Sequence, residues 1–452
     1  MDILTFFAGC STLTTSTTVR HLAIIAQAML TMTGRVTMLN LSRWTRRQGG
    51  SYRTIQRFFA TRLPWTAMLV EFFRQHLFDP TDEYILGGDA TTITKAGNQT
   101  HGIDRFFSGV LGQVVKGLEF FVFSLISVKR GKSYPLLVEQ TVRSEEEKTI
   151  LKQRREVRLA KSKPPKKQRK KLRGRPKGVK NKAKEKAEFS AELLRINGFL
   201  KRLLQLISFF VAVKHLVLDG HFGHAQAVLL ARENGLELVS KLRCDASLYE
   251  KYEGAYGGRG PKRKYGEKLN YDKLPAKYVK KSERQEDVVT NYYQGIFLNR
   301  KFSSPLNVVI IEKKDVKKAK VGRVLLFSSD LALGWEKLIE YYSSRFQIEF
   351  NFRDAKQHFG LEDFMNIAPT GVENAANLSF LMVNLSAKLL AEKEESCVGI
   401  NDLKSQFRGV FYALETIKIV EPKAEGILIE RAKEVISRIG SIHRYNFSTS
   451  SA

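Results

Sequence analysis

The order of strands and helices along the chain is the feature that most constrains its fold. Apolar runs and helical periodicity predict, in order, strands at 84–89, 106–115 and 118–128, a helix at 189–213, a strand at 214–219, a helix at 225–234 and a strand at 236–242. The second and third strands would form a hairpin that turns near Lys116 and Gly117. This order predicts a mixed α/β sheet, in which neighbouring strand ends can bring together acids that are distant in sequence.

Two of the predicted strands end in an acidic residue. Asp89 ends the strand at 84–89, and Asp219 ends the strand at 214–219. Either acid alone is more typical of a turn or a cap, because Asp after a strand and the pair Asp-Gly both favour turns. Their matching positions instead predict that the two carboxylates meet at the same edge of the sheet.

A third acid lies in the segment 341–356, which contains neither Pro nor Gly and is predicted to be one helix. At about 100° per residue, four of its side chains fall within roughly 60° of one another. These are Tyr342, Arg345, Glu349 and Lys356. The alternative is a surface helix on which Glu349 pairs with Arg345 or Arg353. A carboxylate can hold a metal ion and the two cations can neutralise phosphate, so the four together predict a metal-dependent site for a polyanion.

Three carboxylates that converge would repel one another unless a cation lay between them. Asp89, Asp219 and Glu349 offer hard oxygen ligands, which suit Mg²⁺ or Mn²⁺. Two such ions can activate the attacking oxygen and stabilise the leaving oxygen of a phosphoryl displacement. The sequence therefore predicts these three residues as catalytic metal ligands for two ions, in a reaction that cuts or joins DNA strands.

The charge of the chain favours nucleic acid as its partner. The 452 residues carry a formal net charge of +29, and 43% of them are hydrophobic, which is ample for a buried core. No apolar run reaches the roughly 18 to 20 residues that a membrane span needs. The three cysteines lie far apart and form neither a zinc pattern nor a disulfide framework. We expect a reduced, cytoplasmic, soluble protein that meets DNA or RNA.

Two basic segments are candidates for DNA contact outside the acidic site. Arg53 and Arg57 lie on the second helix of a pattern similar to a helix-turn-helix, although an ordinary basic surface helix is equally consistent with it. The region 129–186 is predicted to be a flexible or partly helical basic excursion. Within it, Arg173, Arg175 and Lys177 form a core similar to an AT-hook, which could lie in the minor groove. The alternative for this core is a solvated basic linker with nonspecific phosphate contacts.

The spacing Tyr-x2-Arg-x3-Glu-x6-Lys at Tyr342, Arg345, Glu349 and Lys356 resembles a branch of the DDE transposases of bacterial insertion sequences. The resemblance covers about residues 84–391. It implies a ribonuclease-H-like mixed sheet with flanking helices, interrupted by a β-rich insertion, plus helical N- and C-terminal regions.

The resemblance also implies a function. Asp89, Asp219 and Glu349 would be the metal-binding triad, and Tyr342, Arg345 and Lys356 would hold the phosphates and distorted bases of the transposon end. The enzyme would excise an insertion sequence and join it to target DNA, as a homodimer on paired ends, in the nucleoid of a bacterial cytoplasm. Two alternatives stay open, namely a catalytically silent transposase-derived DNA-binding protein and a ribonuclease-H-like nuclease.

These observations divide the chain into five regions. They are a helical N-terminal DNA-binding region at 1–80, the first part of the catalytic core at 81–242 with the basic excursion at 129–186, a β-rich insertion at 243–334, the second part of the core with the signature helix at 335–395, and a helical C-terminal region at 396–452.

Overall fold

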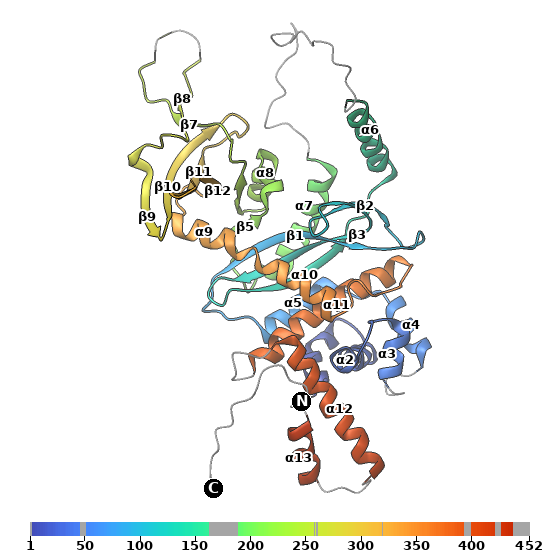
Figure 1. The fold of residues 1–452 in the computed structure, drawn as a ribbon. Helices are drawn as coiled ribbons and strands as arrows, with labels where there is room; N and C mark the ends of the chain where they lie inside the picture. Colours follow the sequence, from blue (N-terminus) through green and yellow to red (C-terminus); the bar gives the residue numbers. More distant parts are fainter. Residues whose placement is uncertain are drawn as a thin grey trace, which may run out of the picture.

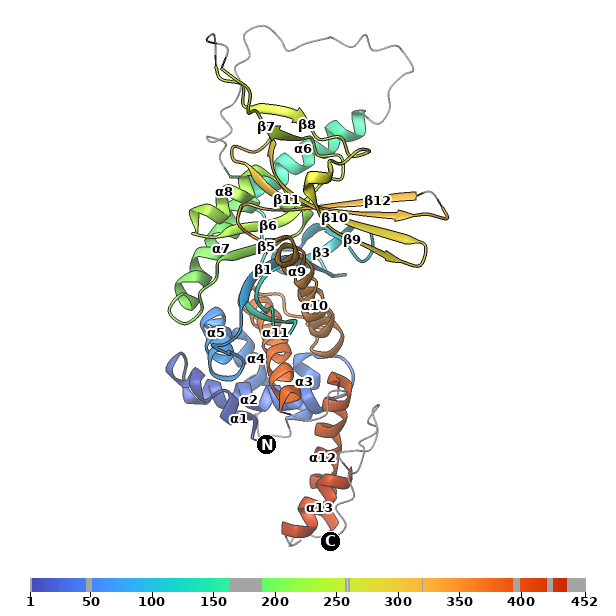
Figure 2. The same cartoon turned by 90° about the vertical axis from the view of Figure 1, so that its left-hand side faces the viewer.

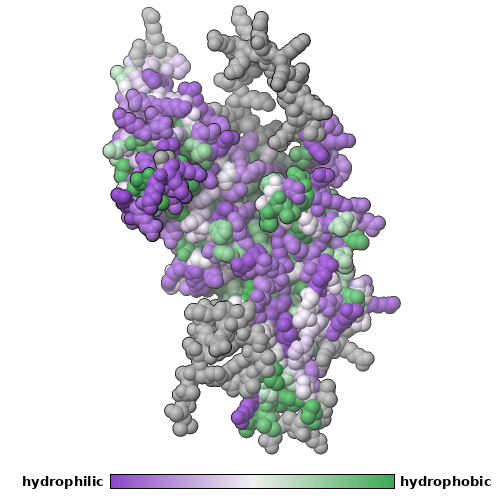
Figure 3. All heavy atoms as spheres, in the orientation of Figure 1, coloured by the Kyte–Doolittle hydropathy of each residue, from purple (hydrophilic) through white to green (hydrophobic). Residues whose placement is uncertain are grey.

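A computed structural model gives the fold. It describes residues 2–45, 51–161, 189–256, 258, 261–318, 320–392, 399–420 and 426–436. A large twisted sheet forms the upper and middle part of the molecule, and a group of helices lies beneath it (Figure 1). Hydrophilic side chains cover most of the visible face, and they are densest over the strands at the upper left (Figure 3). Within the described residues, no helix is both long enough and apolar enough to span a membrane.

The sheet has twelve strands. They are β1 (Tyr84–Thr94), β2 (Asp104–Ser108), β3 (Gln113–Ser127), β4 (Lys132–Gln140), β5 (His215–Leu218), β6 (Glu237–Leu242), β7 (Leu248–Lys251), β8 (Tyr265–Lys268), β9 (Val279–Gln285), β10 (Val288–Asn299), β11 (Leu306–Asp315) and β12 (Lys320–Ser328). Their order is β2-β3-β1-β5-β6-β12-β11-β10-β7-β8, with β4 paired to β3 and β9 paired to β10. Strand β1 is antiparallel to β3 and parallel to β5, and β6 is parallel to β5.

The helices pack on both faces of the central strands. They are α1 (Ile3–Phe6), η1 (Ala8–Thr12), α2 (Ser16–Thr31), α3 (Met38–Trp44), α4 (Tyr52–Ala60), α5 (Trp65–His76), α6 (Glu145–Lys161), α7 (Ala191–Ile207), η3 (Gly220–Phe222), α8 (Ala225–Glu233), η4 (Ala276–Tyr278), α9 (Trp335–Ser344), α10 (Gln347–His358), α11 (Pro369–Ala391), α12 (Ile400–Val420) and α13 (Gly426–Ile436). Helices α7 and α8 lie on one side of β1, β5 and β6, and α9 and α10 lie on the other (Figure 2). The large mixed α/β sheet with flanking helices confirms the predicted α/β class.

Helix α11 joins the N-terminal helices to the sheet. Most of its side chains are buried, including polar ones that need hydrogen-bond partners. Asn374 donates to the Phe59 carbonyl oxygen over 2.8 Å and accepts from the Trp65 indole N–H over 2.6 Å. Asn384 donates to the Pro135 carbonyl oxygen of β4 over 2.8 Å. These bonds fix α4, α5 and β4 around one helix.

The predicted hairpin turn near Lys116 and Gly117 is wrong. Strand β3 runs through both residues, and the turn lies between β2 and β3, where Gly112 has a φ of 62°. Gly117 is needed inside the strand for another reason. A Cβ there would lie 1.9 Å from the Ile93 carbonyl oxygen of β1, so only glycine allows this close approach of two strands.

Part of the predicted basic excursion is regular structure. Residues 132–140 form β4, whose Leu136 and Leu137 are fully buried, and residues 145–161 form α6. The strong positive charge of the whole region hid this short apolar run. In chain order β4 precedes β5. Asp219 therefore follows the fifth strand along the chain and not the fourth, as the strands predicted from the sequence implied. Residues 162–188 lie outside the described part of the chain, and with them the candidates Arg173, Arg175 and Lys177.

The β-rich stretch after β6 continues the same sheet. Strand β12 pairs antiparallel with β6, so the strands from β7 to β12 extend the central strands sideways. The aromatic Phe297 on β10 is buried, and Tyr292 on the same strand packs against Trp335 at the start of α9, with ring centroids 5.2 Å apart. The five regional boundaries expected from the sequence stay predictions.

Candidate active site

The pairing of β1 with β5 places two of the candidate acids next to each other. The last pair of this parallel ladder is Gly88 with Leu218, so Asp89 and Asp219 are the next residues on two adjacent strands. Strand β1 continues to Thr94, which places Asp89 inside a strand and not at its end as predicted. Strand β5 does end before Asp219, which caps η3 and accepts a hydrogen bond from the His221 backbone N–H over 3.1 Å.

The segment with the third acid is interrupted at Arg345 and Phe346, so the prediction of one continuous helix is wrong at this point. Helix α9 ends at Ser344 and α10 begins at Gln347, while the two residues between keep right-handed backbone angles. The N–H groups of Phe346 and Glu349 bond three residues back over 3.0 Å, as in a 3₁₀ turn. This tighter turn changes the rotation between Arg345 and Glu349 from that of a regular helix.

Arg345 lies between the acids and contacts two of them. Its Nη1 donates to Asp89 Oδ2 over 2.5 Å, and its Nη2 is 3.6 Å from Glu349 Oε1. Its side chain is 13% exposed, against 46% for Glu349, so the guanidinium sits at the inner end of the site. The buried Arg345 Nε has no hydrogen-bond partner among the described residues. No local pattern indicated that Arg345 would bridge to Asp89.

The charges at the site act on one another. Burial, with smaller contributions from Asp219 and Glu349, raises the pKa of Asp89 to about 6 against the opposing effects of Arg345 and the Ala90 backbone N–H. Burial also raises the pKa of the Tyr342 phenol, where Asp219 and Asp89 add to the effect and Arg345 opposes it. The structure thus brings three acids, one cation and one phenol into mutual electrostatic reach.

Lys356 lies two turns further along α10 and contacts the same strand as Asp89. Its Nζ donates to the Thr92 carbonyl oxygen of β1 over 2.9 Å and is 3.5 Å from Glu362 Oε1. The side chain is 17% exposed, so it is largely fixed by these contacts. A basic group is therefore held beside β1, three residues past the acid.

The three carboxylates suit a hard divalent ion by their chemistry. Asp89, Asp219 and Glu349 offer only oxygen donors, and Asp219 and Glu349 both raise the pKa of Asp89. Among the residues that the structure describes, however, no three His, Cys, Asp or Glu side chains are arranged to hold a metal ion. Arg345 supplies the positive charge that contacts Asp89 and Glu349.

A second charged group borders Asp219. His221 follows Asp219 closely in the sequence, but the sequence did not indicate its partner. His221 Nε2 is 3.3 Å from Glu192 Oε2 of α7, and this contact raises the pKa of the imidazole. Glu119 of β3 is also close, and burial raises its pKa, with Glu192 adding to the effect. Glu192 and Glu119 come from elements that only the folded chain brings beside His221, so no local spacing could have identified these two acids.

The remaining candidates lie away from the acids. Arg53 and Arg57 are exposed on α4, whose other face packs Ile55, Phe58 and Phe59 into the core. Helix α3 precedes α4, and residues 46–50 between them lie outside the described part of the chain. The helix-turn-helix reading of this region stays a prediction.

The comparisons with known proteins give the class. Residues 9–294 match the family described as DDE superfamily endonuclease, a range that includes Asp89 and Asp219 and ends before Glu349. The chain belongs to this family, which confirms the predicted enzyme class of DDE transposases and endonucleases. A cryo-EM structure of a piggyBac transposase synaptic complex with hairpin DNA is similar at 10% identity, with a TM-score of 0.40, and the alignment covers 97% of this chain and 79% of that chain. No curated protein matches the chain.

Proposed function

We propose that this protein is a DNA transposase of the insertion-sequence type, which excises its element and joins it to target DNA. The observation that carries the proposal is the register of β1 and β5, which sets Asp89 beside Asp219, together with the bridge of Arg345 from Asp89 to Glu349. The strand directions are consistent with the proposed ribonuclease-H-like sheet. Strand β1 is antiparallel to β3 and parallel to β5, and β5 is parallel to β6.

In this proposal, Asp89, Asp219 and Glu349 hold two Mg²⁺ or Mn²⁺ ions. When bound, such ions activate the attacking oxygen and stabilise the leaving oxygen of a phosphoryl displacement. The carboxylates must then be ionised, and the raised pKa of Asp89 means that this acid keeps its proton to higher pH than an ordinary aspartate.

The basic and phenolic groups of the segment have separate roles in binding DNA. Arg345 donates to Asp89 in the structure, and its guanidinium would be able to hold a phosphate with two N–H groups if that contact were released. Lys356 is held by the Thr92 carbonyl oxygen and can bind a phosphate of the DNA strand near the cut as a single positive charge. Tyr342 lies within reach of the guanidinium, with its ring centroid 6.0 Å from Arg345 Cζ, and can pack against a base or sugar.

The partners follow from the same proposal. Double-stranded DNA is bound at the element's terminal inverted repeats and at the target, with a homodimer on the paired ends. Arg53 and Arg57 on the exposed face of α4 are proposed to contact the repeat, and Arg173, Arg175 and Lys177 to contact neighbouring DNA.

The proposal is tested by incubating the full chain with Mg²⁺ and a labelled duplex that carries the inverted repeats flanking its coding region. Excision products and strand-transfer products are expected, and neither should form on a duplex with scrambled repeats. Specific binding without cleavage would instead identify a silent DNA-binding protein. Cleavage that ignores the end sequence would identify a ribonuclease-H-like nuclease, and in both cases the transposase proposal fails.

A further inference from the structure

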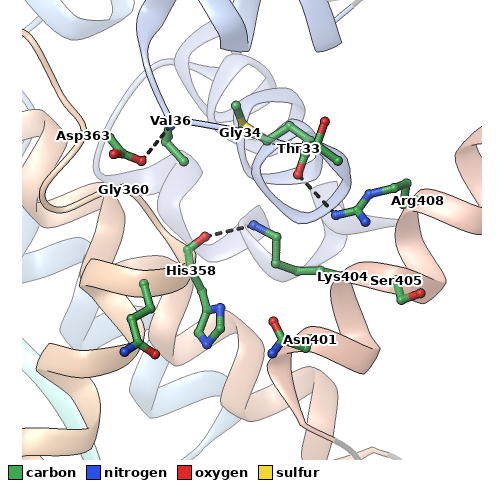
Figure 4. A pocket seen from close by; sticks show the side chains of 12 residues that line it. Thr33, Gly34, Val36, His358, Gly360, Asp363, Asn401, Lys404, Ser405 and Arg408 are labelled. Carbon is green, nitrogen blue, oxygen red and sulfur yellow. Dashed lines mark hydrogen bonds between the residues drawn. The ribbon is translucent and has the colours of Figure 1, made fainter. Parts of the chain in front are cut away.

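A polar cavity lies at the far end of α10 from the acids. Its volume is about 420 Å³, and three segments enclose it: the loop after α2, the C-terminal end of α10 and the first turns of α12. Figure 4 shows Lys404 and Arg408 reaching from α12 toward His358 and the loop at Thr33. The cavity is separate from the candidate active site, because none of the residues lining it belongs to the acid cluster.

Two cationic side chains, Lys404 and Arg408, line this cavity, and each has more N–H donors than the hydrogen bonds described for it. Lys404 Nζ donates to the His358 carbonyl oxygen over 2.9 Å. Arg408 donates from Nε to the Thr31 carbonyl oxygen over 3.1 Å and from Nη2 to the Met32 carbonyl oxygen over 3.5 Å. A lysine has three N–H donors and an arginine has five. Backbone carbonyls at two helix ends therefore position both groups, and among the described residues no hydrogen bond is recorded for their remaining N–H donors.

The negative charge at the cavity does not balance these cations. Among the described residues that line it, Asp363 is the sole acid. Its carboxylate already accepts from the Val36 backbone N–H over 3.0 Å and lies 3.3 Å from Arg35 Nε. Burial, with a smaller contribution from the neighbouring Arg408, lowers the pKa of Lys404 to about 8 against the opposing effect of Asp363. Two like charges are thus held together at a cost that a bound anion would remove.

We propose that this cavity binds a phosphate group, with Lys404 and Arg408 as its cationic ligands. Arginine and lysine are side chains that proteins use for phosphate, and the neutral polar side chains of Asn401 and Thr33 line the same space. The group is either a phosphate of the DNA backbone or a free phosphate. The place of the cavity fits the first source, since it lies between the helix that carries Glu349 and the loop that leads to α3, in a chain of net charge +29.

The first arm of the test uses inorganic phosphate and the full-length protein without DNA or divalent metal. Phosphate at about ten times its Kd should raise the Tm by about 1–2 °C, measured against chloride at equal ionic strength. Lys404→Gln should lose this rise. Lys418→Gln is the matched control, because Lys418 is 63% exposed on the same helix, outside the cavity, and should keep the rise. An equal rise in Lys404→Gln and in the control would overturn the proposal.

The second arm distinguishes the two sources. Binding of a random duplex is measured over a range of salt concentrations for both variants. If the ligand is a backbone phosphate, Lys404→Gln should lower the slope of log K against log salt by about one relative to Lys418→Gln. Equal slopes together with the loss of the phosphate effect would assign the cavity to a free phosphate. Neither arm requires cleavage, so a failure here is distinguishable from a failure of the proposed transposase activity.

Discussion

The two ends of helix α10 hold charge in opposite ways. Just before its first turn, the Arg345 guanidinium contacts Asp89 and Glu349, so the chain itself supplies the compensating charge. At its last turn, Lys404 and Arg408 share a cavity in which Asp363, the one acid among the described lining residues, is already bound by Arg35 and Val36. The comparison teaches that charge at a site can be compensated by a side chain of the same protein, as at Arg345. It can also be left without full compensation, as at Lys404 and Arg408, where a ligand of opposite charge would supply it. The following predictions test each half of this contrast.

The largest effect is expected from removing an acid of the candidate active site. Glu349→Gln, Asp89→Asn or Asp219→Asn should lower DNA cleavage by about 10³-fold or more, because each removes a group that acts on the transition state. DNA binding should stay close to that of the unchanged protein in a gel-shift assay. Glu340→Gln, an exposed acid on α9, is the control and should cleave normally. Normal cleavage by any of the three variants would refute the role assigned to that residue.

The next largest effect is a pH dependence of stability that arises from Asp89. Its pKa is raised from 3.8 to about 6 in the folded protein, so the folded state holds more protons than the unfolded state between these values. Without metal, the free energy of unfolding should therefore fall as pH rises from about 4 to about 6, by up to about 3 kcal/mol. Urea unfolding at several pH values measures it. The same fall in Asp89→Asn would show that another group is responsible.

The lowered pKa of Lys404 predicts a change of the opposite sign in the free energy of unfolding at alkaline pH. Its pKa is lowered from 10.5 to about 8, so the folded state holds fewer protons between these values. The free energy of unfolding should rise as pH increases from about 8 to about 10, by up to about 2 kcal/mol. Phosphate should reduce this rise, because it stabilises the charged lysine. The slope should be smaller in Lys404→Gln than in Lys418→Gln but should not vanish, because Lys95, whose pKa burial also lowers to about 8, contributes in both variants. Unfolding curves at several pH values measure the difference.

The smallest predicted effect concerns metal affinity in the absence of DNA. Arg345→Met removes the internal cation that competes with metal for Asp89, so Mn²⁺ should bind about tenfold more tightly, a gain of about 1.4 kcal/mol. Electron paramagnetic resonance of free Mn²⁺ measures this without any cleavage. Arg353→Met is the matched control, since Arg353 pairs with Asp354 on the same helix and should leave the affinity unchanged. Weaker Mn²⁺ binding by Arg345→Met would mean that the arginine does not compete with metal.

The sequence was informative where the signal is local. The apolar runs that contain Asp89 and precede Asp219 predicted two strands correctly, because alternation and β-branched content act over a few residues. Strand β4 was missed because a single short apolar run lay inside a region dominated by charge. The hairpin turn was misplaced because Gly117 resembles a turn residue, while its real role is to let β1 approach β3 closely.

The amino-acid sequence by itself determined the chemistry of this protein: a strongly basic chain, an α/β order of elements, and acids set in strands and on a helical segment. The tertiary structure decided which charges meet. Three features join residues from separate elements. They are the contact of Arg345 with Asp89, the contact of His221 with Glu192, and the cavity lined by Lys404 and Arg408. The physical reason is that periodicity reports the local path of the backbone, whereas electrostatic energy depends on distances and burial that only the packed chain sets.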